Sequence, residues 1–267
     1  MKTIEALREE CKDRCGKVSR IINWKSFFTL LGACAISSLF VVPYQAALLP
    51  GLAEMGAMLY VLAFAQSLVV FSIVTFFGLL LARKMGLSLL VLEGENKWEN
   101  LKAILMPSAL LGVLSGVLII LADFAFQGLS ISLLQEEMHV SIWAAFLASF
   151  YGGIAEEVLM RLFVMTFFVW LISKIARTKE GLLANWIVWV AIVLSSVLFG
   201  LGHLPMTSAL TAITAIVVVR AVVLNGIGGV VFGWLYWKKG LMSAMIAHFF
   251  ADIVLHVITP VVVGMFI

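Results

Sequence analysis

Charged residues and cysteines are scarce in this sequence of 267 residues. Only 12% of the residues are charged and 63% are hydrophobic, which is more apolar surface than a soluble domain of this length can bury. The net charge is only +3, and most Lys and Arg residues lie between the apolar runs, so the pattern does not favour nucleic-acid binding. Cys11, Cys15 and Cys34 are spaced neither for a disulfide framework nor for a four-ligand zinc site. The sequence therefore predicts a polytopic membrane protein.

Long apolar runs predict an all-α bundle of membrane-spanning helices. The predicted spans lie at about 27–49, 56–81, 103–126, 141–171, 182–202, 206–237 and 241–263. Within 206–237, the segment from Arg220 to Gly226 reads as a break, which turns one long span into a hairpin of two short ones. We therefore expect about eight spans, with seven as the alternative. Residues 1–26 are expected to form a cytoplasmic amphipathic arm, and 27–267 the membrane domain.

Basic loops alternate with loops that lack Lys and Arg. The N-terminal arm, the loop 83–102 and the segment 174–181 are rich in Lys and Arg, whereas the loop 127–140 has none. Because cytoplasmic loops carry an excess of Lys and Arg, this alternation places the N-terminus and both basic loops in the cytoplasm. Lys238 and Lys239 fall on the opposite side in the eight-span arrangement and are its exception.

Three charged residues stand close together inside the fourth predicted span. An intramembrane charge costs at least ~2.5 kcal/mol on insertion scales, so Glu156, Glu157 and Arg161 need a reason to be there. Glu157 and Arg161 are four residues apart, which allows an ion pair within one helix. Glu156 has no such partner, which suits a general acid or base. The alternative interpretation is that both glutamates only hold helices together.

Two further spans carry ionisable groups. His203 ends the fifth span, and His248 lies four residues before Asp252 on one face of the last span. We expect these groups to converge with the glutamate motif, because an isolated polar group in hydrocarbon is costly. The cluster could activate a water directly, or bind Zn²⁺ through His203, His248, Asp252 and Glu156 with an open position. His256 extends the same face by one turn and is interpreted as a lining or packing residue.

The ordered motifs resemble those of one known family. Glu-Glu-x-x-x-Arg, Phe-x-x-x-His and His-x-x-x-Asp, on successive spans between 150 and 256, resemble the CPBP family of Rce1-type CAAX prenyl endopeptidases and their bacteriocin-processing relatives. The resemblance implies a helical membrane bundle with its catalytic core at about 141–256. It also implies that Glu156 and His203 activate a water, while His248 and Asp252 bind an oxyanion or a metal. Prenyl-processing members usually have Asn where this chain has Asp252, and an ionised carboxylate cannot donate a hydrogen bond to an oxyanion.

The sequence thus predicts an intramembrane endopeptidase that cleaves a membrane-associated protein or peptide. The predicted location is the cell membrane, with the site nearer the side whose loops lack Lys and Arg, although prenyl-protein proteases of this family act on cytosolic substrates. Two other classes remain open: a non-catalytic membrane scaffold and, with less support, a proton-coupled transporter. A transporter is disfavoured because no inverted repeat relates the two halves.

Overall fold

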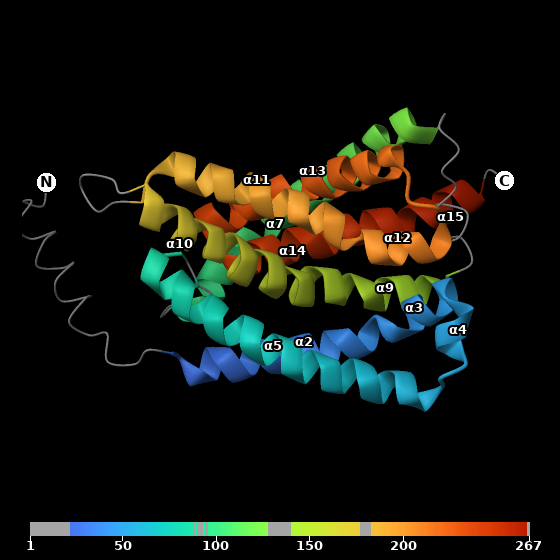
Figure 1. Ribbon diagram of the computed structural model, residues 1–267, viewed down its shortest axis with the longest axis horizontal. Helices are drawn as coiled ribbons and strands as arrows, with labels where there is room; N and C mark the ends of the chain where they lie inside the picture. The colour runs from blue at the N-terminus through green and yellow to red at the C-terminus, as the bar shows by residue number, and fades with distance from the viewer. Residues whose placement is uncertain are drawn as a thin grey trace, which may run out of the picture.

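The fold is a bundle of helices that run roughly along the long axis of the molecule (Figure 1). The computed structural model describes residues 22–87, 89, 93, 96–127, 140–176 and 183–265, which contain helices and no strand. The predicted all-α class is therefore confirmed. Most of the predicted N-terminal arm, 1–26, lies outside the described residues.

The helices begin and end at identifiable signals. Their bounds are α2 (Trp24–Phe40), α3 (Val42–Leu48), α4 (Pro50–Ala53), α5 (Ala57–Met85), α7 (Lys97–Gln127), α9 (Ile142–Phe150), η1 (Tyr151–Glu156), η2 (Val158–Met165), α10 (Thr166–Ile175), α11 (Asn185–Gly202), α12 (Leu204–Leu210), α13 (Ala215–Lys239), α14 (Leu241–Asp252), η3 (Ile253–Ile258) and α15 (Thr259–Gly264), where η marks a π-helix. Asn23 and Ser141 cap α2 and α9, because their side chains accept hydrogen bonds from backbone N–H groups of the first turn. Gly86 and Gly240 end α5 and α13 with positive φ angles, 68° and 95°.

Seven helical stretches among the described residues are long and apolar enough to span a membrane. They are Trp24–Leu48, Ala57–Met85, Lys97–Phe126, Ile142–Ile175, Asn185–Leu210, Ala215–Lys239 and Leu241–Gly264. The hairpin favoured for 206–237 is not present, because α13 is one continuous helix. The seven-span alternative is the arrangement that the structure shows.

Arg220 does not break the sixth span because it has a partner in the third. Its guanidinium donates two hydrogen bonds to the carboxylate of Asp123 on α7, at 2.7 and 2.9 Å. Asn225, expected in a turn, bonds instead through its side-chain amide to the carbonyl of Ala221 in its own helix. With these polar groups satisfied, the helix continues through the segment.

The glycines of this region serve close packing between α11 and α13. A Cβ at Gly229 would lie 2.6 Å from Oγ of Ser196, and one at Gly200 would lie 2.6 Å from Cα of Val222. Real Cβ atoms do not approach other atoms so closely, so both positions exclude larger side chains. Small residues at membrane helix contacts let two backbones approach. The glycine signal therefore indicated a helix contact and not a turn.

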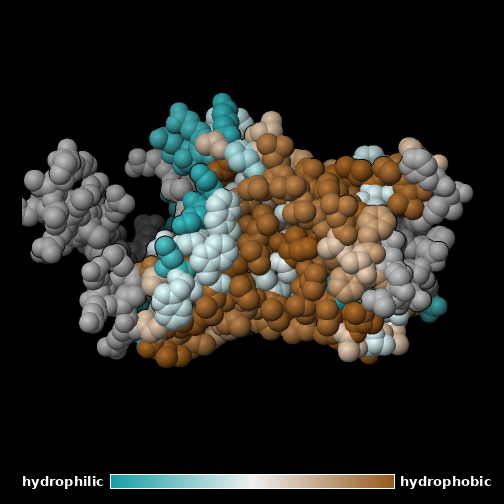
Figure 2. Space-filling model, turned by 90° about the horizontal axis from the view of Figure 1, so that it is seen from above, coloured by the Kyte–Doolittle hydropathy of each residue, from teal (hydrophilic) through white to brown (hydrophobic). Residues whose placement is uncertain are grey.

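The basic residues gather at one end of the bundle. Arg83 and Lys84 lie in the last turn of α5, Lys174 in that of α10, and Lys238 and Lys239 in that of α13. Figure 2 shows hydrophilic atoms toward this end and a broad hydrophobic surface beyond them. With seven spans, Lys238 and Lys239 agree with the other basic residues. We call this the basic end.

Gly240 also lies at the basic end, which corrects the expectation that it lies opposite. That expectation assumed helices of similar reach beyond the site. His248 is seven residues, or about 11 Å, from the start of α14. Glu157, which contacts His248, is 18 residues, or about 27 Å, before the end of α10. The fourth span therefore extends about 16 Å farther toward the basic end than the last span does.

Candidate active site

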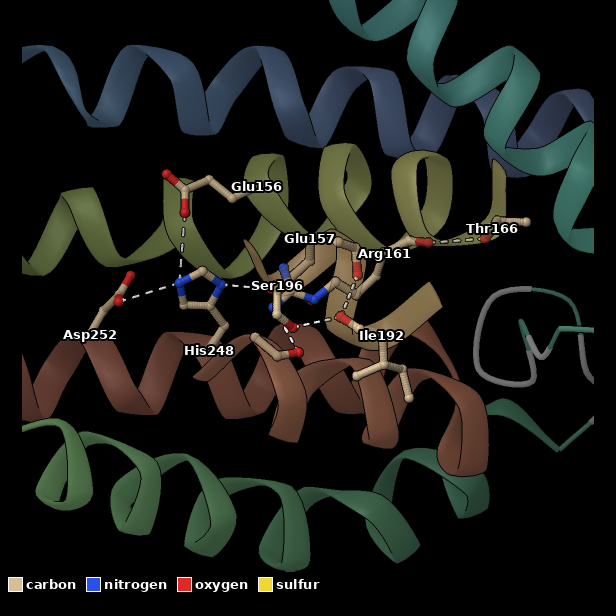
Figure 3. A network of polar contacts seen from close by, with 10 residues as sticks. Glu156, Glu157, Arg161, Thr166, Ile192, Ser196, His248 and Asp252 are labelled. Atoms are coloured by element: carbon tan, nitrogen blue, oxygen red, sulfur yellow. Dashed lines mark hydrogen bonds and ion pairs between the residues drawn. The ribbon is translucent and has the colours of Figure 1, made fainter. Parts of the chain in front are cut away.

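Glu157 is the centre of a buried polar cluster. Its Oε1 accepts a hydrogen bond from Nδ1 of His248 at 2.8 Å, and its Oε2 lies 3.3 Å from Nε of Arg161 (Figure 3). The Arg161 pair is the one predicted from the four-residue spacing. The contact with His248 was not predicted, because nothing in the local sequence of α14 indicates which carboxylate faces it. Glu157 thus joins the fourth span to the last.

Arg161 is enclosed by aromatic rings as well as by its carboxylate. Its Cζ lies 4.9 Å from the ring centroid of Phe199 and 5.5 Å from that of Phe232. Its Nη2 donates to the carbonyl of Gly229 at 3.5 Å. Cations are attracted to the faces of aromatic rings, most strongly where water is excluded. Arg161 is therefore held by contacts with three different helices: η2, α11 and α13.

The second ring nitrogen of His248 faces two partly exposed carboxylates. Nε2 lies 3.7 Å from Oε2 of Glu156 and 3.5 Å from Oδ1 of Asp252 (Figure 3). These distances are longer than direct hydrogen bonds and are of the kind that a water often completes. The side chains of Glu156 and Asp252 are 23% and 13% exposed, whereas that of Glu157 is fully buried. The cluster therefore has a closed side at Glu157 and a more open side at Glu156.

His203 lies at the junction of α11 and α12. Its Nδ1 donates to the carbonyl of Phe199 at 2.8 Å, since a carbonyl can only accept, and this leaves Nε2 as an acceptor. The ring of Phe199 contacts both imidazoles, with centroid distances of 4.8 Å to His203 and 5.6 Å to His248. His203 is thus brought against the same phenyl ring as His248 and lies at the rim of the cluster.

Two successive π-helices carry the glutamates and the arginine. Glu156 ends η1, Glu157 follows it, and Arg161 lies within η2. Wide turns of this kind occur mostly at functional sites. The hydroxyl of Thr166 donates to the carbonyl of Arg161, five residues earlier, at 3.0 Å, and so satisfies a backbone group in the widened turn. The sequence showed the charges but not this change of helical pitch.

Phe232 and Gly152 contribute to the site without having been predicted. The ring of Phe232 stacks on His248 with centroids 4.7 Å apart and planes 22° apart. Gly152 lies in η1 against the side chains of Asp252 and His248. Neither residue is charged, and each acts through the close approach of another helix, so no local signal marks them. His256, in contrast, lies 3.3 Å from the hydroxyl of Tyr44, as expected of a packing residue.

The predicted metal ligands do not form a recognisable metal centre. Among the described residues, no group of three or more His, Cys, Asp or Glu side chains is arranged to hold a metal ion. Nδ1 of His248 is engaged by Glu157, and Nδ1 of His203 by a backbone carbonyl. The zinc hypothesis stays a prediction, and we derive no chemical step from it.

One comparison with known proteins identifies the segment that carries this cluster. A model of the family described as type II CAAX prenyl endopeptidase Rce1-like matches residues 138–254. This part of the chain is an Rce1-like domain. The match confirms the family that the three motifs resembled, and all six predicted site residues lie within it. No curated protein and no solved structure matches the chain at a significant level.

Proposed function

We propose that the protein hydrolyses a peptide bond of a membrane-associated protein or peptide, with a water activated at Glu156. The Rce1-like family supports a CAAX-protease-like intramembrane endopeptidase in general. The observation that carries the finer proposal is the group around Nε2 of His248. Two partly exposed carboxylates lie just beyond direct hydrogen-bonding distance of that nitrogen, which leaves unused acceptors beside it for a water and a substrate carbonyl.

Glu156 is proposed as the general base. Its carboxylate takes a proton from the water, whose oxygen attacks the carbonyl carbon of the scissile amide. The proton then passes from Glu156 to the leaving nitrogen, so that a carboxylic acid and an amine are formed. His203, with Nε2 as an acceptor, assists in holding the water, as the family resemblance implies.

His248 is proposed to stabilise the negative charge that develops on the carbonyl oxygen. Because Glu157 accepts from Nδ1, Nε2 is the nitrogen directed at the substrate, and in the imidazolium form it donates a hydrogen bond to the oxyanion. Glu157 and Arg161 orient this ring and keep its plane fixed. Asp252, when ionised, cannot donate to an oxyanion, so its proposed role is to hold the Nε2 edge of His248.

The test is cleavage of candidate membrane-associated peptides by the purified full-length protein in detergent or vesicles. Loss of a general base typically lowers the rate by 10²–10⁴-fold, so we expect Glu156→Gln to reduce kcat by at least about 100-fold with an unchanged melting temperature. Glu54→Gln is the matched control, because Glu54 is exposed and lies in the connection between α4 and α5.

The same assay separates the alternatives. Cleavage that persists with a strong chelator, in protein shown to be free of metal by elemental analysis, supports direct activation by Glu156, whereas chelator-sensitive cleavage restored by Zn²⁺ supports the metal hypothesis. Full activity in the Glu156→Gln variant would remove Glu156 from the mechanism. Absence of cleavage in the native protein across the peptide set, with tight binding of a membrane partner that Glu156→Gln leaves intact, favours the scaffold.

A further inference from the structure

Gly152 lies closer to the reactive side of the cluster than any side chain could. It is a buried residue of η1, one turn before Glu156. A Cβ built at Gly152 would overlap Oδ2 of Asp252 and would lie 3.2 Å from Nε2 of His248. The two atoms belong to the groups that face Glu156 from α14.

The next glycine makes a different contact. A Cβ at Gly153 would lie 2.9 Å from the backbone carbonyl oxygen of Met245 and 3.0 Å from Cβ of Phe249. These atoms are fixed to the helix α14 and cannot move without the helix. Gly153 therefore sets the distance between η1 and α14, whereas Gly152 adjoins the movable end of one side chain.

We propose that Gly152 is a positioning residue that keeps the carboxylate of Asp252 beside Nε2 of His248. This inference rests on the proposed function for its meaning, because Nε2 is the nitrogen assigned to the substrate. The bare backbone at Gly152 leaves the space that the Asp252 carboxylate occupies, and any side chain there displaces it. Asp252 is short and 13% exposed, so its carboxylate can rotate toward the open side of the cluster at little cost to the fold.

The consequence is a separation of effects between neighbouring glycines. Gly152→Ala moves Asp252 away from His248 while η1 stays in place, and alanine itself favours a helix over glycine. Gly153→Ala instead pushes η1 from α14 and acts on stability. We expect Gly152→Ala to leave the melting temperature within about 3 °C of the native value and Gly153→Ala to lower it by more.

The readout is the chemical reactivity of His248, which needs no substrate. The full-length protein in detergent is treated with diethyl pyrocarbonate, and the modification rate of His248 is measured by mass spectrometry relative to His203. With the Asp252 carboxylate displaced, Nε2 is less covered, and the ratio rises roughly threefold or more in Gly152→Ala and to a similar extent in Asp252→Ala. The double variant Gly152→Ala/Asp252→Ala shows no further increase, because both changes act on one contact.

The outcomes distinguish this inference from the proposed function. A native labelling ratio in Gly152→Ala, an additive effect in the double variant, or an equal change in Gly153→Ala would each overturn the role of Gly152, whether or not the protein cleaves peptides. Where cleavage is detected, Gly152→Ala lowers kcat with KM little changed. Where no cleavage is found, the proposed function fails, while the labelling ratios still decide the role of Gly152.

Discussion

Glu157 is fully buried and serves two neighbours at once. One carboxylate oxygen accepts from His248, and the other faces Arg161. Because the burial of a single carboxylate is costly, its stability in the bundle depends on both partners. Glu156, one residue earlier, is partly exposed and has a long contact with His248. We therefore assign orientation of the histidine to Glu157 and chemistry to Glu156, although the two residues are adjacent and identical.

This assignment makes Arg161 a residue of the fold. Arg161→Ala leaves the carboxylate of Glu157 buried without its cation, and breaking a buried pair costs about 3–5 kcal/mol. We expect a loss of stability of that order, measured by reversible unfolding in mixed detergent micelles. Arg83→Ala is the matched control, because the Arg83–Glu93 pair is more exposed and such pairs contribute about 0–1 kcal/mol.

A smaller loss in Arg161→Ala than in Arg83→Ala would contradict the assignment. So would a large loss of stability in Glu156→Gln combined with native stability in Glu157→Gln. In that case the roles of the two glutamates would be exchanged.

At the scale of elements, α13 is the helix on which the bundle and the site both depend. It packs on α11, α7 and α14, and it presents Phe232 to the ring of His248. Its outer half is joined to α7 by the Asp123–Arg220 pair, whose side chains are each 14% exposed. Two charges in a span would usually favour a break, but here each neutralises the other across a helix contact. The pair therefore allows a single long helix where the sequence suggested two short ones.

Reversal of this pair tests its role in α13. We expect Asp123→Arg and Arg220→Asp each to lower the unfolding free energy by about 2–5 kcal/mol, because each places two like charges together in a partly buried site. The double variant Asp123→Arg/Arg220→Asp restores most of the loss, as judged by unfolding in mixed micelles. Additive losses in the double variant would show that the two side chains do not stabilise each other. None of the three variants touches the cluster around His248, so peptide cleavage per folded molecule should stay near the native rate.

At the scale of the whole molecule, the distribution of charge orients the bundle. Arg83, Lys84, Lys174, Lys238 and Lys239 lie at one end, which the positive-inside rule assigns to the cytoplasm. Glu156 is 14 residues from the opposite end of the fourth span and 19 residues from the basic end. The partly exposed side of the cluster is therefore nearer the non-cytoplasmic face. Proteases of this family that act on prenylated proteins take cytosolic substrates, so the orientation bears directly on the substrate.

Single cysteines can establish the orientation. In a variant without native cysteines, Ala212→Cys marks the exposed connection between α12 and α13, and Lys239→Cys marks the exposed basic end. We expect an impermeant thiol reagent to label Ala212→Cys on intact cells, and to label Lys239→Cys only after the membrane is permeabilised. The reverse labelling would place the basic end outside and would turn the site toward the cytosol.

Much of the candidate site could be predicted because its residues are charged in an apolar background. Glu156, Glu157, Arg161, His203 and His248 are conspicuous for that reason, and the Glu157–Arg161 pair follows from helical spacing alone. The partner of His248 could not be predicted in the same way. It is set by the relative depth and rotation of two helices that are 91 residues apart in sequence, and the π-helices alter that rotation.

Uncharged residues of the site were beyond prediction for a related reason. Gly152 and Phe232 act by how closely a second helix approaches them, and a glycine or phenylalanine in a membrane span is otherwise ordinary. The same reason explains the error at 206–237. Glycine, asparagine and arginine are turn and boundary signals in isolation, whereas here they pack against α11, bond within the helix, or pair with α7.

The sequence by itself determined that this is a helical membrane protein with an Rce1-like set of polar motifs, because apolar length and intramembrane charge are local properties of the chain. Only the tertiary structure decided that there are seven spans and not eight, that all basic span ends gather together, and that His248 lies between Glu157 on one side and Glu156 and Asp252 on the other. These features depend on contacts between helices, which local sequence does not specify.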